Sequence, residues 1–124
     1  MEQKYTEEFE LDGKNFIYID FSGIITNDEF RERIKLVERE IVKYPEDSLY
    51  TITNAEGIRF DTESKEIAAQ YMMRNKPYIR HGAVIGLDGI TKVMINSIVA
   101  LSGRRNIHYT FSKEQAIEWL AEQE

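Results

Sequence analysis

The fold is decided by residues 82–120, which read GAVIGLDGITKVMINSIVALSGRRNIHYTFSKEQAIEWL. This stretch contains an apolar run, a glycine turn, a helix-length apolar segment, a second short run and a capped helix. The first run, Ala83–Leu87, carries no charge and ends at Asp88 and Gly89, which is typical of a strand that is buried on both faces. Such strands belong to parallel α/β sheets. The stretch therefore predicts two consecutive strand-then-helix units that lie against one sheet.

The residues before this stretch predict a hairpin and then helices that alternate with strands. Asp12 and Gly13 supply the turn of the hairpin. Thr26 and Glu29 have the spacing of a helix-capping box, and the apolar residues that follow recur at helical intervals. The expected elements are a hairpin over residues 5–21, a helix over 27–43, a strand over 49–53, a helix from Asp61 or Thr62 to about Asn75, a strand over 82–87, a helix over 90–101, a strand over 107–111 and a final helix capped by Ser112.

These elements predict an α/β fold with a mostly parallel sheet of four to five strands and about four helices. The antiparallel edge strand of the sheet would come from the N-terminal hairpin. Glu7, Glu8 and Glu10 lie on its first strand and would protect that edge by their charge. With 124 residues the chain fits a single domain over residues 1–124.

Composition and charge narrow the classes of partner. The chain has 22 acidic against 16 basic residues and a formal charge of −6, so electrostatics opposes nucleic-acid binding and we expect no such partner. No apolar stretch approaches the roughly 20 residues that span a bilayer, and the acidic N-terminus does not resemble a secretory signal. We therefore expect a cytoplasmic protein without stable membrane insertion. The lack of cysteine excludes disulfides, thiolate metal sites and thiol nucleophiles.

Several motifs together resemble those of a known family. Residues 75–78, Asn-Lys-Pro-Tyr, precede the run Ala83–Gly86, and the following helix is closed by Ser-Gly-Arg at 102–104. Phe111 then leads to Ala-Ile-Glu-Trp-Leu at 116–120, the most specific of these motifs. The chain resembles, over most of its length, the SpoIIAA-like family of small STAS-type domains. The resemblance implies a four- to five-stranded sheet with helices mostly on one side, and a regulatory or ligand-binding module rather than an enzyme.

The chain departs from the family at the phosphorylation site of its anti-anti-sigma members. Those proteins carry an Asp-Ser-Ser-Gly type motif at the start of the helix after the third strand. The matching place here reads Thr-Asn-Ala-Glu-Gly at 53–57 and then Asp-Thr-Glu-Ser at 61–64. We interpret Thr62 and Ser64 as helix-start residues. The family also looks in outline like the lipid-binding CRAL-TRIO fold, which implies an apolar ligand cleft.

Few residues of this chain could catalyse a reaction or bind a metal ion. The chain has two histidines, His81 and His108, and no spacing places a nucleophile beside its base. We therefore expect no catalytic residues, no metal site and no cofactor. A hydrolytic or transfer enzyme, the least favoured alternative, would have to use Asp61, Ser64 and His81.

Two features could contact an anion. The turn Gly86–Gly89 lies between a strand and a helix, where free backbone N–H groups can hold an anion, although a turn that requires glycine explains the same residues. Arg80 with His81, and Arg104 with Arg105, enter two successive strands at their N-terminal ends, so they would gather positive charge at one end of the sheet if those strands are adjacent. The alternative is that these basic residues only complement the dipoles of the preceding helices.

The helices over residues 62–75 and 90–101 carry more apolar side chains than one buried stripe requires. A deeper core, a second subunit or an apolar ligand could cover the surplus, and all three explanations stay open. The surplus consists of Tyr71, Met72, Met73, Val93, Met94 and Ile98.

From these patterns we expect a non-enzymatic STAS-like interaction and regulatory module. Its partner would be a protein, with a second copy of the chain as one candidate. The expected interaction face comprises Asn54, Gly57, Asp61, Thr62, Ser64, Tyr71, Met72, Met94 and Ile98. The alternative is a carrier of a small apolar, lipid-like molecule in a cleft between the two apolar helices, lined by Tyr71, Met72, Met94 and Ile98.

Overall fold

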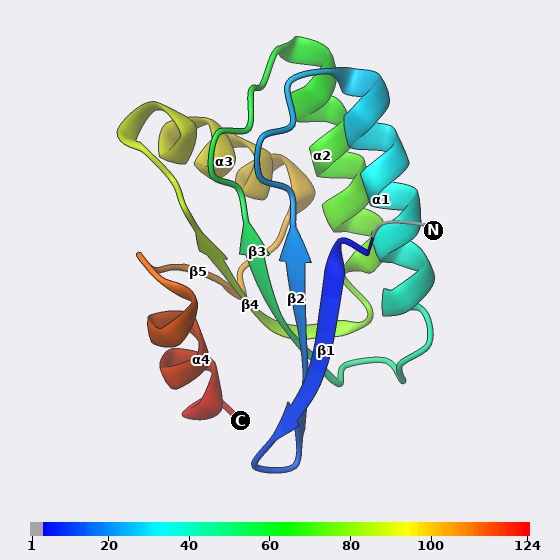
Figure 1. Cartoon of the computed structure of the whole chain (residues 1–124), viewed down its shortest axis with the longest axis vertical. Coiled ribbons are helices and arrows are strands. Elements are labelled where there is room, and N and C mark those ends of the chain that lie inside the picture. Colours follow the sequence, from blue (N-terminus) through cyan, green and yellow to red (C-terminus); the bar gives the residue numbers. More distant parts are fainter. Residues whose placement is uncertain (1–3) are drawn as a thin grey trace.

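The computed structural model describes residues 4–124, which form five strands and four helices around one sheet (Figure 1). The elements are β1 (Thr6–Leu11), β2 (Lys14–Asp20), α1 (Asn27–Ile41), β3 (Leu49–Asn54), α2 (Thr62–Asn75), β4 (Ile79–Ile85), α3 (Gly89–Ser102), β5 (Ile107–Tyr109) and α4 (Lys113–Ala121). Within these residues no helix has the length and apolarity that a membrane crossing requires.

The strands lie in the sheet in their chain order, from β1 to β5. β1 pairs antiparallel with β2 through a turn at Asp12 and Gly13, whose φ angles of 51° and 77° are those of a tight hairpin turn. The pairs β2–β3, β3–β4 and β4–β5 are parallel. The expected mostly parallel α/β sheet with an antiparallel edge strand is confirmed.

The strand order explains where the helices lie. α1, α2 and α3 each connect neighbouring parallel strands in the same direction along the sheet, and right-handed crossovers then place all three on one face. α4 follows β5 and covers the opposite face (Figure 1).

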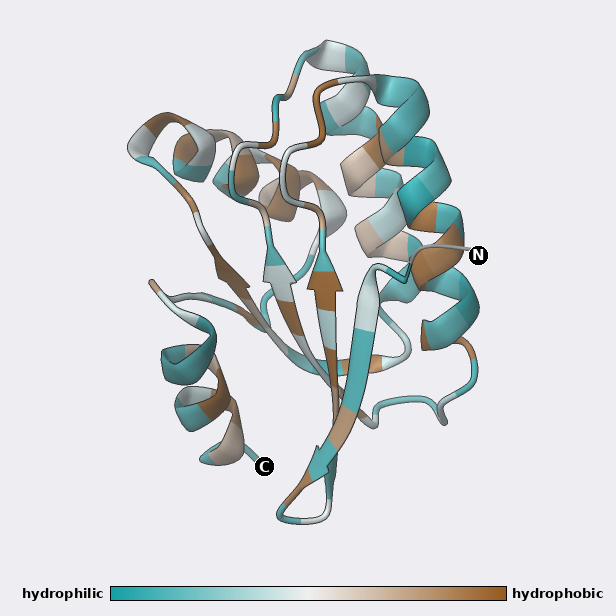
Figure 2. Ribbon diagram, viewed as in Figure 1, coloured by the Kyte–Doolittle hydropathy of each residue, from teal (hydrophilic) through white to brown (hydrophobic). Residues whose placement is uncertain are grey.

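The alternation of side chains along the strands builds a core on each face. Ile17 and Ile19 of β2 pack in the larger core with residues of α1, α2 and α3. Phe16 of β2 and Ile52 of β3 point the other way and pack with Leu120 of α4. Each fully buried aliphatic side chain of this kind contributes about 1.5–3 kcal/mol relative to an exposed one. The outer side of α1 is mostly hydrophilic, whereas α3 carries hydrophobic residues along much of its length (Figure 2).

Three elements differ by two or more residues from the bounds expected for them. α1 ends at Ile41 instead of near Lys43, because the N–H groups of Lys43 and Tyr44 bond carbonyls three residues back and the last turn tightens. β4 covers Ile79–Ile85 instead of 82–87, since its partner β3 supplies hydrogen bonds from Leu49 onward. β5 ends at Tyr109, and Phe111 is exposed beyond it.

Candidate functional site

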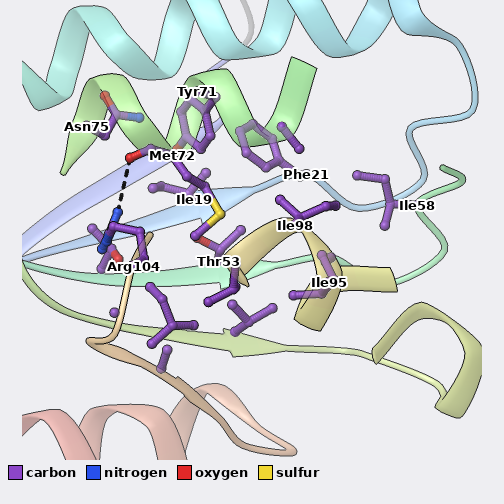
Figure 3. A pocket seen from close by; sticks show the side chains of 18 of the residues that line it. Ile19, Phe21, Thr53, Ile58, Tyr71, Met72, Asn75, Ile95, Ile98 and Arg104 are labelled. Carbon is purple, nitrogen blue, oxygen red and sulfur yellow. Dashed lines mark hydrogen bonds between the residues drawn. The ribbon is translucent and has the colours of Figure 1, made fainter. Parts of the chain in front are cut away.

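An apolar pocket lies between α2, α3 and the face of the sheet that carries three helices (Figure 3). Its free volume is about 70 Å³. The strands contribute Thr53 and Val84, whereas Met72 comes from α2 and Ile95 and Ile98 come from α3. Thr51, Thr53, Tyr71, Asn75 and Arg104 carry the polar side-chain groups of its lining, so the pocket is suited to an apolar group that makes a few polar contacts.

α3 covers this pocket and is only lightly anchored. Of its 14 residues, all of them described, only Ile98 and Ser102 are buried. The helix begins at Asp88, whose carboxylate accepts a hydrogen bond of 2.7 Å from the Thr91 N–H, and this bond lowers the pKa of Asp88. It ends at Gly103 with a left-handed φ of 72°. Because few side chains hold it, α3 can shift at small cost to admit a ligand.

One end of the pocket is polar, and its polar groups are deeply buried. Arg104 is 5% exposed and Asn75 is 2% exposed. Figure 3 shows both at the same end of the pocket, away from Ile58 and Ile95. Three buried side-chain nitrogens within residues 4–124 lack a hydrogen-bond partner, and two of them are Nη2 of Arg104 and Nδ2 of Asn75.

The other donors of Arg104 are held by neutral acceptors. Its Nε donates to Oδ1 of Asn106 at 2.8 Å, and its Nη1 donates to the Met72 carbonyl at 3.4 Å. No carboxylate within the described residues forms an ion pair with this guanidinium. Burial lowers the pKa of Arg104, because the charged form loses its hydration.

Tyr71 is buried against the same pocket. Its ring meets that of Phe21 edge-on, with ring centroids 5.5 Å apart. Burial raises the pKa of the Tyr71 phenol, so the hydroxyl stays neutral near pH 7.

The residues of the expected interaction face lie at different depths. Gly57, Asp61 and Thr62 are exposed, and Asn54, Met72 and Met94 are partly exposed. Ser64, Tyr71 and Ile98 are buried and offer no surface to a macromolecule.

The start of α2 shows why Ser64 is buried. The Ser64 N–H donates to the Asp61 carboxylate at 2.8 Å, and the Asp61 N–H donates to Ser64 Oγ at 2.6 Å. The hydrogen bond from the Ser64 backbone lowers the pKa of Asp61. α2 begins at Thr62, so the interpretation of Thr62 and Ser64 as helix-start residues is confirmed.

The residues expected to line an apolar cleft are brought together in part. Tyr71, Met72 and Ile98 line the pocket, but Met94 does not. Sequence reasoning missed Asn75 and Arg104 as lining residues. Asn75 follows the apolar stripe of α2 and Arg104 follows that of α3, yet no local pattern indicates that either side chain is buried.

The basic residues at the starts of β4 and β5 do become neighbours, since these strands are adjacent. They differ in their contacts, however. Arg80 pairs with Asp47 at 2.9 Å, while Arg105 lines an open hollow and Arg104 points inward. His81 and His108 line the same hollow as Arg105.

The two histidines contact Trp119 rather than a reactive group. The ring centroid of Trp119 lies 6.0 Å from that of His81 and 4.0 Å from that of His108. Asp61 and Ser64 belong to the start of α2, so the structure does not join them to His81. Within residues 4–124, no three histidine, aspartate or glutamate side chains converge as metal ligands.

Comparison with family models, with curated proteins and with solved structures finds no match for this chain.

Proposed function

We propose that this protein is a non-enzymatic binding module for a small apolar molecule, held between α2, α3 and the sheet. The observation that carries the proposal is an apolar pocket with two unpartnered buried donors at one end, beneath a helix that buries only Ile98 and Ser102. A ligand would fill the free volume and would complete the hydrogen bonding of the polar end. The flexible side chain of Met72 can repack around ligands of different shape.

The proposal also includes membership in the SpoIIAA-like group of STAS-type domains and a place in the cytoplasm. The order of the strands and the three helices on one face of the sheet support the family assignment. That resemblance favours a carrier or a regulatory sensor over an enzyme, and no cofactor is needed for either.

Native mass spectrometry of protein purified from cells tests the proposal. We expect a small bound mass on the wild type that the variant Ala68→Leu lacks, because Ala68 lines the pocket and a leucine would fill it. Ala100→Leu is the matched control, since Ala100 is exposed on α3 outside the pocket lining. A wild type without any bound mass, or a mass that Ala68→Leu retains, would contradict the proposal.

A second candidate function is an interaction module that uses the outer side of α3. Ile90, Val93 and Leu101 recur at helical spacing along this side and are 79%, 66% and 67% exposed. These are large apolar side chains that a protein partner would cover, and a second copy of the chain is the first partner to test.

Light scattering coupled to size exclusion tests this second function. We expect the wild type to have twice the monomer mass of 14.6 kDa, and the variant Val93→Glu to have the monomer mass. The Glu carboxylate would have to lose its hydration in an apolar interface. This single substitution on the outer side of α3 should therefore be enough to prevent the dimer from forming. A wild type that is monomeric at every concentration speaks against self-association.

A further inference from the structure

We infer that the pocket takes a small apolar carboxylate, whose oxygens accept hydrogen bonds from Nη2 of Arg104 and Nδ2 of Asn75. The inference deepens the proposed function and rests on it, because it assigns the chemistry of the ligand that the pocket would hold.

The two unpartnered groups are both donors, so the missing group must be an acceptor. A buried guanidinium without a counter-charge is rare in proteins, since a buried charge is usually paired. The acceptors that Arg104 already has, the Asn106 side chain and the Met72 carbonyl, are neutral. The acceptor that suits the site is therefore an anion.

Neighbouring contacts hold the guanidinium in place. Nδ2 of Asn106 donates to the carbonyls of Ile79 and Arg80 at 3.0 Å and 2.9 Å, so its Oδ1 is left to accept from Nε of Arg104. Arg104 is thereby fixed at the start of β5, and its Nη2 is left without a partner at the end of the pocket. Such preorganised donors bind an anion at low entropic cost.

The charge and size of the site favour a carboxylate over a phosphate. One cation and two free donors match one negative charge and two oxygens, whereas a phosphate would bring more charge and more oxygens than this end can satisfy. The remaining lining is apolar, and about 70 Å³ of free volume holds about two or three methylene-sized groups, so a longer tail requires α3 to shift outward. The structure thus fits a monocarboxylic acid with a short apolar tail.

Three six-carbon probes test the inference: hexanoate, neutral hexanol and cationic hexylamine. Each is titrated into protein with ¹³C-labelled methionine methyl groups, where Met72 reports on the pocket and the exposed Met73 serves as the internal control. We expect hexanoate to bind roughly tenfold or more tightly than hexanol, because hydrogen bonds to charged groups are the stronger ones. Hexylamine should bind most weakly, since its charge would face that of Arg104.

Two variants remove the anion site without touching the apolar walls. Arg104→Met should lose the preference for hexanoate while still binding hexanol, whereas Arg105→Met, at the exposed neighbouring position, should keep it. Asn75→Asp replaces an unpartnered donor by a carboxylate at the same end of the pocket as Arg104, so we expect hexanoate affinity to fall roughly tenfold or more and hexanol affinity to stay unchanged.

The outcomes separate the inference from the proposed function. Equal binding of hexanoate and hexanol by the wild type would overturn the carboxylate assignment and leave an apolar pocket in place. Failure of both to shift the Met72 methyl signal would overturn the proposed function as well. If Arg104→Met does not fold, the ranking of the three probes on the wild type still decides the question.

Discussion

Replacing Gly86 with alanine is expected to lower the free energy of unfolding by about 3 kcal/mol. Gly86 joins β4 to α3 with a φ of +80°, a region that alanine enters only with strain. An added Cβ would also lie 2.7 Å from Oδ1 of Asn54 and 2.9 Å from the backbone nitrogen of Glu56, closer than real contacts allow. Urea denaturation measures the loss.

Gly103→Ala is the matched control for this change. Gly103 has a φ of +72°, but nothing lies within 4 Å of its added Cβ. We expect a loss of about 1 kcal/mol there, from backbone strain alone. Equal losses of unfolding free energy at the two glycines would show that the close contacts at Gly86 with the loop after β3 add nothing to the cost of the substitution. A larger loss at Gly86 means that its close packing against the loop after β3 adds to the cost of backbone strain.

Ile98→Ala is expected to lower the free energy of unfolding by about 2–5 kcal/mol. Ile98 is one of the two buried residues of α3 and lines the pocket, so its truncation removes an anchor of the helix and enlarges the cavity. Hexanol should restore part of the lost stability, because a ligand that binds only the folded state shifts the unfolding equilibrium. Thermal unfolding with and without hexanol measures both effects.

Leu120→Ala provides the comparison for Ile98→Ala. Leu120 is fully buried in the core under α4, on the opposite face of the sheet, and its truncation should cost a similar amount. Hexanol should stabilise this variant no more than the wild type. If it rescues both variants equally, the alcohol acts on the protein in general and the pocket is not its site.

The succession of helices and strands could be predicted because its signals are local. Thr26, Asp61 and Ser112 each accept a hydrogen bond from a backbone N–H three residues ahead, and each marks the start of a helix. The limits of β4 could not be predicted as well, because they depend on hydrogen bonds to β3, which comes from a distant part of the chain.

The lining of the candidate site was predictable only for its apolar part. Tyr71, Met72 and Ile98 follow from the surplus of apolar residues on the two helices. Met94 lies one helical turn before Ile98 but outside the pocket lining, since the direction in which α3 faces the sheet is set by packing.

Arg104 and Arg105 show which parts of this structure can be predicted from the amino-acid order and which cannot. The order specifies that two arginines follow the glycine that ends α3, and it predicts the parallel sheet beside them. It does not tell which arginine is buried. That difference arises because Asn106, bound to two carbonyls at the start of β4, accepts a hydrogen bond from Arg104 and holds it inward, while Arg105 stays exposed. The contact of Asn106 with the start of β4, on the other side of α3 in the sequence, therefore creates the charged end of the pocket.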